Sequence, residues 1–420
     1  MYHFTQYLYN VRTIVLAIIV STPVSAIQDD LELYIRKAQE NNPVIKQAFS
    51  RWKSAEADIA GAKGLPNPSV SLGYFLESVE TAAGPQEYKI GLTQKFPWLG
   101  KRGLQGKIQA ARAEKAYQKF QKQRLALDNK VSSTWYDYYY LMRITDLTRQ
   151  NFELIQNWDS VIRSKYVTSQ TGHPDLIKTQ IELIQLEDEL FSLEGKKSPI
   201  LEKFRGLLND AQLSEITIPE SLAFIRGTFE KAVIKNDIQN ANPDIMMANV
   251  EITLQKSRVK RAKLNRMPDV GIGVEKITTG EKIGSAFSGN DPLVVKFSLD
   301  IPIWFKKNRS SIASAGHSLT AAEKQAESVR NDLSTQLENV LYDLEESSRQ
   351  VQLYHNVLIP KGLESLGASE KAYRADKIDF LSLVDAQRRL LQFQMKYEQA
   401  LVNYLKAKSR LSVLTGEKLS

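Results

Sequence analysis

Residues 67–77 read NPSVSLGYFLE and residues 87–98 read EYKIGLTQKFPW, with a polar loop between them. The pattern returns as MPDVGIGVEKI at 267–277 and LVVKFSLDIPIW at 293–304. Apolar residues in these segments alternate with small or polar ones, which is the period of a β-strand with two unlike faces. The sequence therefore predicts two β-hairpins, at 68–96 and 268–302, each ending near a Pro and a Trp.

Long segments with few helix breakers follow both hairpins. Between Lys101 and about Lys165 there is no Pro, and an unbroken helix of that length would be roughly 100 Å long at about 1.5 Å per residue. No globular core needs such a helix, so it indicates a coiled coil or an α-helical tube. A turn at 171–174 then leads into a second helix that runs back to about Leu193.

The same order of elements occurs twice along the chain. Asn42-Pro43 matches Asn242-Pro243 at an offset of 243 − 43 = 200 residues, and Pro68 matches Pro268 at the same offset. A repeat of this kind has to be recognised before the fold is assigned, because it determines the architecture. We expect a first repeat at 27–226, with hairpin 68–96, a long helical hairpin at 101–194 and a broken equatorial segment at 195–226. The second repeat, 227–420, has hairpin 268–302 and a long helical hairpin at 308–414, interrupted near Pro360.

The first 26 residues have the composition of a secretory signal peptide. Arg12 precedes the apolar run 14–20, Pro23 ends that run, and residues 24–26 offer a small-x-small cleavage site. A transmembrane anchor is the alternative, but the run is shorter than the roughly 20 residues that a spanning helix needs. A secreted chain of this kind is periplasmic, exported or a membrane β-barrel.

Charge and cysteine content narrow the function further. The chain has a formal net charge of +8, which would suit nucleic acid or an anionic surface; secretion argues against nucleic acid as a partner. There is no Cys, so disulfides, a thiolate nucleophile, Cys-ligated metal and a lipid-modified N-terminal Cys are excluded.

The predicted strands are too few for a soluble sandwich, in which two sheets would bury their apolar faces against each other. In a membrane barrel the apolar face meets lipid, and aromatic residues collect at both interfaces. Four strands cannot close a barrel, because single-chain barrels have at least about eight and open edges are not tolerated in hydrocarbon. The sequence therefore requires an oligomer. The candidate aromatic residues at the membrane–water interfaces are Tyr74, Phe96, Trp98, Phe297 and Trp304.

The whole mature chain resembles the TolC-like outer membrane factors of Gram-negative bacteria. The residues that carry the resemblance are Ala38 with Asn42-Pro43, the segment PNPSV at 66–70, KFPWLGK at 95–101, and YRADKI at 373–378 followed by Leu381, Leu383 and DAQ at 385–387. In the family a Gly usually stands within the last of these motifs, where this chain has Asp376 or its neighbour.

The resemblance implies a mainly α fold with a small β part: a long α-helical barrel plus a transmembrane β-barrel assembled from four strands per protomer. It implies a homotrimer in contact with outer membrane lipid and extending into the periplasm. Its partners would be a periplasmic adaptor (membrane fusion) protein and a proton-driven inner-membrane pump. Residues 95–101 are most similar to members that export heavy-metal cations. Drug efflux and type I protein secretion are alternatives, and a periplasmic structural coiled-coil protein is an alternative of another class.

Motifs for catalysis, cofactors or metals are not found in the sequence. Gly271-Ile272-Gly273 lacks a third glycine in phase, and Gly100-Lys101 has no Gly five residues before it. His173, His317 and His355 are widely spaced. The sequence thus predicts a protein that is not an enzyme and that has no cofactor and no metal site.

The candidate functional residues lie at the two helical turns. Three copies of an acidic residue around a narrow axis would form a cation-selective ring, and the resemblance implies a pore constriction in this region. The alternative is that the acids cap helices, a role that suits Asp379. Leu176 and Leu383 would either form an adaptor-docking tip or pack the turn. The candidate gate residues are Asp376, Asp379, Tyr373, Arg374 and Asp175.

Overall fold

The structure is a computed structural model that describes residues 24–168 and 173–416, with only the backbone for 24–29. The predicted signal peptide lies outside these residues apart from its last three, and so do residues 171 and 172 of the predicted turn. The chain divides into two compact units. Unit 1 comprises the described residues up to 46, 123–238 and 333–416, and unit 2 comprises 47–122 and 239–332. Each unit takes segments from both predicted repeats.

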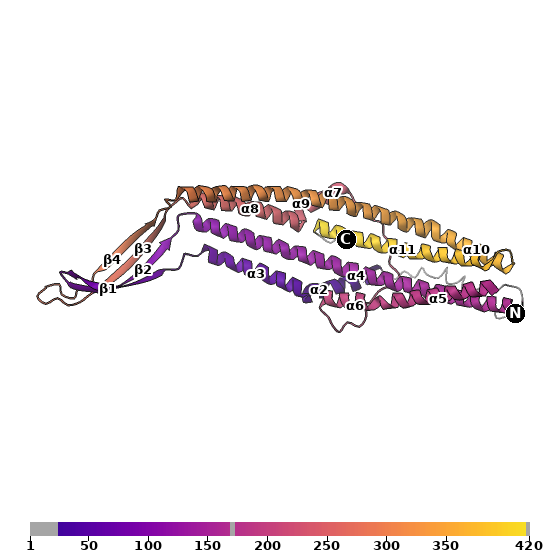
Figure 1. Cartoon of the computed structure of the whole chain (residues 1–420). Helices are drawn as coiled ribbons and strands as arrows, with labels where there is room; N and C mark the ends of the chain where they lie inside the picture. The colour runs from indigo at the N-terminus through magenta and orange to yellow at the C-terminus, as the bar shows by residue number, and fades with distance from the viewer. Residues whose placement is uncertain (1–23, 169–172, 417–420) are drawn as a thin grey trace. The chain divides into compact units, whose positions relative to one another are not determined.

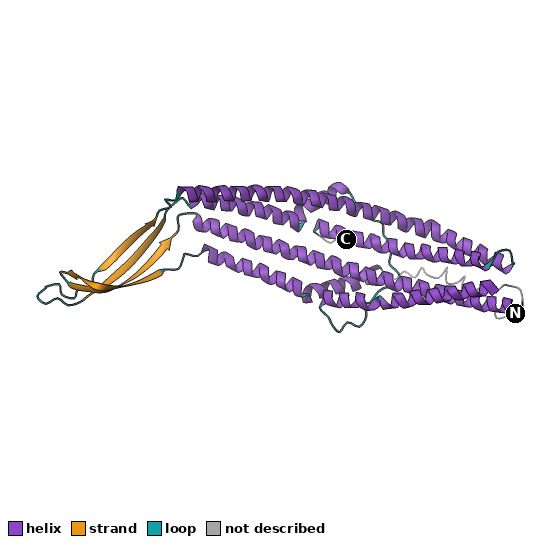
Figure 2. Cartoon of the chain, viewed as in Figure 1, coloured by secondary structure: helices purple, strands orange, loops and turns teal. Residues whose placement is uncertain are grey.

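Helices make up most of the described chain, as predicted (Figure 2). The order of helix, hairpin, long helix and returning helix occurs twice (Figure 1). No helix among the described residues is both long and apolar enough to cross a membrane. The helices are α2 (Val24–Asn41), α3 (Pro43–Lys63), α4 (Lys101–Val167), α5 (His173–Gly195), α6 (Lys197–Leu208), α7 (Lys231–Ala241), α8 (Pro243–Leu264), α9 (Phe305–Leu353), α10 (Ile359–Arg374) and α11 (Phe380–Thr415).

The repeated Asn-Pro pairs have a local structural role. The side chain of Asn242 accepts hydrogen bonds from the backbone N–H groups of Asp244 and Ile245, at 2.8 and 3.3 Å, and so caps α8. The Asn42 side chain accepts from the backbone N–H of Val44 at 2.9 Å in the same way. Pro in the first turn of a helix has no N–H left unsatisfied. The pair therefore starts a helix in each repeat.

The predicted interruption of the second long helix lies just before Pro360. A π-helical segment, Tyr354–Leu358, separates α9 from α10. Pro has no N–H to donate to the carbonyl of the residue four positions earlier. The hydrogen-bond pattern therefore changes at this point, while the chain continues as a helix on both sides.

The strands form one four-stranded antiparallel sheet in unit 2, in the order β1-β2-β3-β4 (Figure 2). Their bounds are β1 Ser69–Thr81, β2 Gly84–Phe96, β3 Asp269–Thr279 and β4 Leu293–Asp300. The first hairpin is tighter than the sequence suggested, since Thr81 pairs with Gly84 and only Ala82 and Ala83 lie between them. Gly84 has a φ of +122°, a conformation that glycine adopts without a steric penalty. Residues 78–81 and 84–86, expected in a loop, therefore extend the strands.

Pairing between β2 and β3 joins the two hairpins and continues one apolar row across all four strands. Val70 pairs with Leu92, Leu92 with Val274, and Val274 with Val295. These four side chains are between 46% and 66% exposed. The opposite face carries polar side chains. They include an ion pair between Lys296 and Glu275, and Glu275 is only 6% exposed. An exposed apolar face opposite a charged one is the arrangement of a sheet whose outer solvent is lipid.

An irregular segment of unit 1, residues 209–230, is held to the helices by aromatic side chains. The Trp135 indole N–H donates to the Thr217 carbonyl at 3.0 Å, and the Thr217 N–H donates to the Tyr34 hydroxyl at 3.0 Å. The Tyr404 hydroxyl accepts from the Gly227 N–H at 2.8 Å and donates to the Ile225 carbonyl at 3.1 Å. Backbone groups that have no helix or sheet partner are satisfied in this way.

Candidate functional site

The turn between α10 and α11 contains the acidic residue that the sequence singled out. Asp376 has a φ of +53°, and its backbone N–H donates to the Tyr373 carbonyl at 3.1 Å. Asp is one of the few residues other than Gly that enters the left-handed region at a modest penalty. Asp376 is thus the residue that adopts the backbone conformation a glycine favours. This explains how the turn forms without the glycine that the motif usually has.

Asp376 is paired with a residue that the sequence did not reveal. Its carboxylate lies 2.7 Å from Nζ of Lys165, near the end of α4. The Asp376 side chain is 75% exposed and the Lys165 side chain 20%. The Lys165 ammonium also lies 4.7 Å from the centre of the Tyr373 ring. A cation near a helix C-terminus is favoured by the helix dipole, which is the only local sequence signal for Lys165.

Tyr373 is buried in the hydrophobic cluster beneath this ion pair. It is 5% exposed and contacts Trp158 and Phe380 edge-on, with ring centroids 5.6 and 5.7 Å apart. Its hydroxyl has no hydrogen-bond partner among the described residues. Burial raises the pKa of Tyr373, and the negative charges of Asp175 and Asp376 raise it further. Tyr373, Asp175 and Asp376 therefore belong to one electrostatic neighbourhood.

Asp379 and Arg374 complete the predicted set. Asp379 is the N-cap of α11, and its Oδ1 accepts from the backbone N–H of Ser382 at 3.0 Å and from the Ser382 hydroxyl at 2.5 Å. The Ser382 hydrogen bonds lower the pKa of Asp379 below its ordinary value. The Arg374 guanidinium lies 5.9 Å from the centre of the Trp158 ring. The geometry of Asp379 is that of the capping alternative.

The two leucines of the predicted docking tip differ in position. Leu383 is 2% exposed and lies inside the cluster with Phe380, whereas Leu176 is half-buried at its edge. Leu383 therefore packs the turn and presents no surface in the protomer. Sequence reasoning missed an exposed apolar stripe on α5, formed by Ile177, Ile181 and Ile184, which are 41%, 50% and 65% exposed. Their spacing places all three on one helical face.

Polar contacts between α4, α5 and α11 lie farther from the turn. The Gln387 amide donates to the Asn151 side chain at 2.8 Å, and the Arg388 guanidinium binds Glu182, whose residue exposure is 5%. Among the described residues, Nδ2 of Asn151 and Oε1 of Gln387 are buried without a hydrogen-bond partner. Gln387 ends the motif DAQ at 385–387, whereas Asn151, Glu182 and Arg388 lie outside the predicted motifs. Their pairing across long sequence separations left no local signal.

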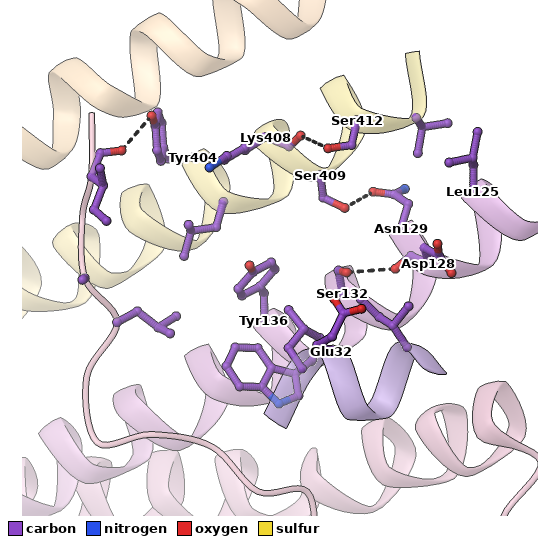
Figure 3. A pocket seen from close by; sticks show the side chains of 18 residues that line it. Glu32, Leu125, Asp128, Asn129, Ser132, Tyr136, Tyr404, Lys408, Ser409 and Ser412 are labelled. Carbon is purple, nitrogen blue, oxygen red and sulfur yellow. Dashed lines mark hydrogen bonds between the residues drawn. The ribbon is translucent and has the colours of Figure 1, made fainter. Parts of the chain in front are cut away.

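A pocket of unit 1, of about 280 Å³, lies where α2, α4 and α11 meet residues 222–225 (Figure 3). Trp135, Tyr136 and Tyr404 form part of its wall, and the Ser409 hydroxyl donates to the Asn129 side chain at 3.0 Å beside it. None of the predicted site residues lines this pocket. The residues described by the structure contain no group of three or more His, Cys, Asp or Glu side chains suited to a metal ion.

The predicted membrane-interface aromatics lie on the sheet of unit 2 and near its ends, with exposed side chains. Tyr74 and Phe297 are each 75% exposed, Trp304 is 70% exposed, and Phe96 and Trp98 are 39% and 38% exposed. The backbone N–H of Trp98 donates to Oδ1 of Asp269 at 2.7 Å, which ties the end of the first hairpin to the second. Large aromatic side chains exposed around an apolar sheet face are typical of a membrane interface.

Comparison with known proteins links a large part of the chain to a family. Residues 235–417 match the family model described as outer membrane efflux protein. Nodulation protein T of Rhizobium leguminosarum bv. trifolii is 22% identical over 400 residues, which are 92% of this chain and 85% of that protein. Residues 235–417 are therefore those of an outer membrane efflux protein. Proteins of this family are outer membrane channels that extend into the periplasm, and they are not enzymes.

Solved structures have this fold along more than nine tenths of the chain. The outer membrane protein VceC of Vibrio cholerae has a TM-score of 0.77 at 14% identity, covering 94% of this chain and 98% of that one. The open state of the MtrE outer membrane channel of Neisseria gonorrhoeae has a TM-score of 0.76 at 15% identity, covering 93% and 90%. Channels of this family are trimers that work with adaptor and inner-membrane pump partners.

Proposed function

We propose that this outer membrane channel exports heavy-metal cations as the outer component of a tripartite system with a periplasmic adaptor and a proton-driven inner-membrane pump. The observation that carries the substrate class is the segment KFPWLGK at 95–101, which is similar to the heavy-metal members of the family. In this chain the segment has a structural task, since Trp98 and Lys101 both bind Oδ1 of Asp269 at 2.7 Å. The channel itself is a passive duct.

The proposed gate is the turn that carries Asp376. Three copies of its largely exposed carboxylate around the channel axis would attract cations. The Lys165 ammonium, 2.7 Å away, neutralises each carboxylate in the closed turn. The Tyr373 ring lies under the Lys165 ammonium, and Asp175 acts on Tyr373 together with Asp376. Arg374 and Asp379 belong to the same turn, where they contact Trp158 and Ser382. Opening the gate separates Lys165 from Asp376 and exposes the acidic ring to the passing cation.

The proposed contact with the adaptor is the α5 surface that begins at Leu176 and continues along the exposed isoleucine stripe. Apolar side chains that remain exposed in a row on one helix are suited to packing against helices of a partner. Leu383 supports this surface from within. Replacing Ile181 by Asp should abolish capture of the cognate adaptor while the trimer still forms, whereas Val167→Asp, at another exposed apolar residue, should not.

Growth of a deletion strain tests the substrate class. We expect reduced growth on Zn²⁺, Co²⁺, Cd²⁺ or Ni²⁺ and raised cellular content of the same metal, measured by elemental analysis, both restored by the intact gene. Tolerance to drugs and dyes should be unchanged. Drug or dye sensitivity with normal metal content would replace the proposal by drug efflux. Loss of an exported protein from the medium would replace it by type I secretion.

A further inference from the structure

Both hairpins end in the same succession of residues. PWLGKR at 97–102 and PIWFKKNR at 302–309 each place a Trp after the last strand and then consecutive cations at the start of a long helix. The aromatic side chains at these ends are exposed, most of all Trp304 at 70% and Phe305 at 79%. All of these residues belong to unit 2.

The cations of the first copy are engaged by the protein itself. The Lys101 ammonium lies 2.7 Å from Oδ1 of Asp269 and 2.9 Å from the Met267 carbonyl. The Arg102 guanidinium donates to the Lys63 carbonyl at 3.0 and 2.5 Å. These two side chains therefore have a structural role at the junction of α4 with the sheet.

The cations of the second copy have no such partners in the part of the chain that the structure describes. Lys306, Lys307 and Arg309, here called the α9 cation cluster, are exposed. Within residues 24–168 and 173–416, none of them has an acidic partner within 4.0 Å or a side-chain hydrogen bond. The first turn of α9 contains no acidic residue, and positive charge at a helix N-terminus opposes the helix dipole. The described part of the protomer thus provides no counter-charge for this cluster.

The cluster comes a few residues after β4, whose residues are all exposed. Ile301 and Ile303 are 64% and 58% exposed, and Asp300, the nearest acid in the sequence, is bound to Lys95 at 2.8 Å. Long basic side chains at the end of a lipid-facing segment extend their charged groups to the headgroup level. The α9 cation cluster therefore lies where lipid phosphates are within reach.

We propose that Lys306, Lys307 and Arg309 bind the phosphates of anionic phospholipids in the leaflet next to the helices. The ligand is a phospholipid headgroup, because the cluster adjoins exposed Trp304 and Phe305, and Trp is enriched at the headgroup level of membranes. Three such clusters in the trimer form a ring that fixes the depth of the sheet in the bilayer. This role is independent of the exported substrate.

Quenching of tryptophan fluorescence by brominated lipids tests the proposal on the whole trimer in vesicles. At low salt we expect brominated phosphatidylglycerol to quench the tryptophan fluorescence more strongly than brominated phosphatidylcholine. At the sheet, this quenching reports only lipid that lies near Trp98 and Trp304. Replacing all three cations by Gln should weaken the relative binding of phosphatidylglycerol at least roughly fivefold, the effect of about one cation at an anionic surface. About 1 M NaCl should reduce the wild-type preference, since it shortens the Debye length to about 3 Å.

Matched variants separate lipid binding from folding. K306R/K307R/R309K keeps the charges and should keep the preference. K119Q/K256Q removes two exposed cations, without partners among the described residues, from other parts of α4 and α8, and should have no effect. Equal quenching by both lipids in the wild type, or an unchanged preference in the triple Gln variant, would overturn the proposal. Displacement by inorganic phosphate beyond that by chloride at equal ionic strength would identify a phosphate-ion site instead.

Discussion

The Nζ atom of Lys165 lies 2.7 Å from Oδ1 of Asp376, although the two residues are 211 positions apart in the chain. The pair joins the last turn of α4 to the turn after α10, and the Tyr373 ring lies beneath the ammonium. An exposed pair of this kind contributes at most about 1 kcal/mol to folding. In the proposed gate, the pair matters because it decides whether the Asp376 carboxylate is neutralised or available to cations.

Opposite substitutions of this pair should shift ion selectivity in opposite directions. Lys165→Met leaves the Asp376 carboxylate unpaired and should raise cation selectivity, whereas Asp376→Asn leaves the ammonium unpaired and should lower it. Asn is preferred to Ala because it tolerates a positive φ. Reversal potentials of single channels in planar bilayers under a KCl gradient measure the ion selectivity of both variants. Glu364→Gln, at the exposed Lys361–Glu364 pair on α10, is the control, and unchanged traces in both variants would contradict the gate.

The cap at Asp379 should make the start of α11 sensitive to acid. Its pKa in the folded chain is below the ordinary value of 3.8 because of hydrogen bonds from Ser382. The stabilisation is present above about pH 3.8 and is lost as the pH falls through the lower, folded value. Amide hydrogen exchange at residues 380–384, divided by the intrinsic exchange rate at each pH, should therefore be faster at pH 3 than at pH 5. Asp379→Asn keeps an acceptor and should remove this pH dependence; if the dependence persists, another group is responsible.

Substitutions of Leu383 should affect folding of the turn rather than a contact surface. Leu383→Ala leaves a cavity in the cluster with Phe380 and should destabilise the turn by about 2–5 kcal/mol. Leu383→Met conserves volume and should lower stability by less than about 1.5 kcal/mol. Hydrogen exchange of α11 measures the local stability. Adaptor capture should be retained in the Met variant, and its loss there would mean that the side chain contacts the adaptor directly.

The irregular segment 209–230 should loosen when Tyr404 loses its hydroxyl. Tyr404→Phe removes the hydrogen bonds to Gly227 and Ile225, each contributing about 1 kcal/mol. Limited proteolysis should then cut this segment several-fold faster than in the wild type. Tyr342→Phe, at a residue that is 66% exposed, should leave the cleavage rate unchanged. Equal rates in all three proteins would show that packing alone holds the segment.

A charge on the apolar face of the sheet should prevent insertion. Val274 lies in the row that runs from Val70 to Val295, and Val274→Arg should destabilise the membrane-inserted trimer by about 2–4 kcal/mol near the bilayer centre. Ser71→Arg introduces the same side chain on the polar face and should be tolerated. Recovery of folded trimer from lipid vesicles compares the two variants. Similar yields would mean that the apolar face does not contact lipid.

The elements whose signals are local were predicted well. Alternation of side chains along 69–76 and 293–301 identified strands, the Asn-Pro pairs identified helix starts, and the absence of Pro from 101 to 165 identified the long helix. Each of these signals depends on residues a few positions apart, and backbone geometry converts such spacing directly into structure. The extension of β1 to Thr81 was missed because the short turn at Ala82-Ala83 has no strong turn residue before Gly84.

By itself the sequence determined the elements, their order, the repeat and the need for strand partners outside the protomer. Only the tertiary structure decided that β2 pairs with β3, so that Val70, Leu92, Val274 and Val295 form one continuous row. It also decided that Asp376 binds Lys165 and that Leu383 is buried. The reason is physical: these contacts join segments up to about 200 residues apart, and side-chain packing across such separations has no counterpart in local periodicity.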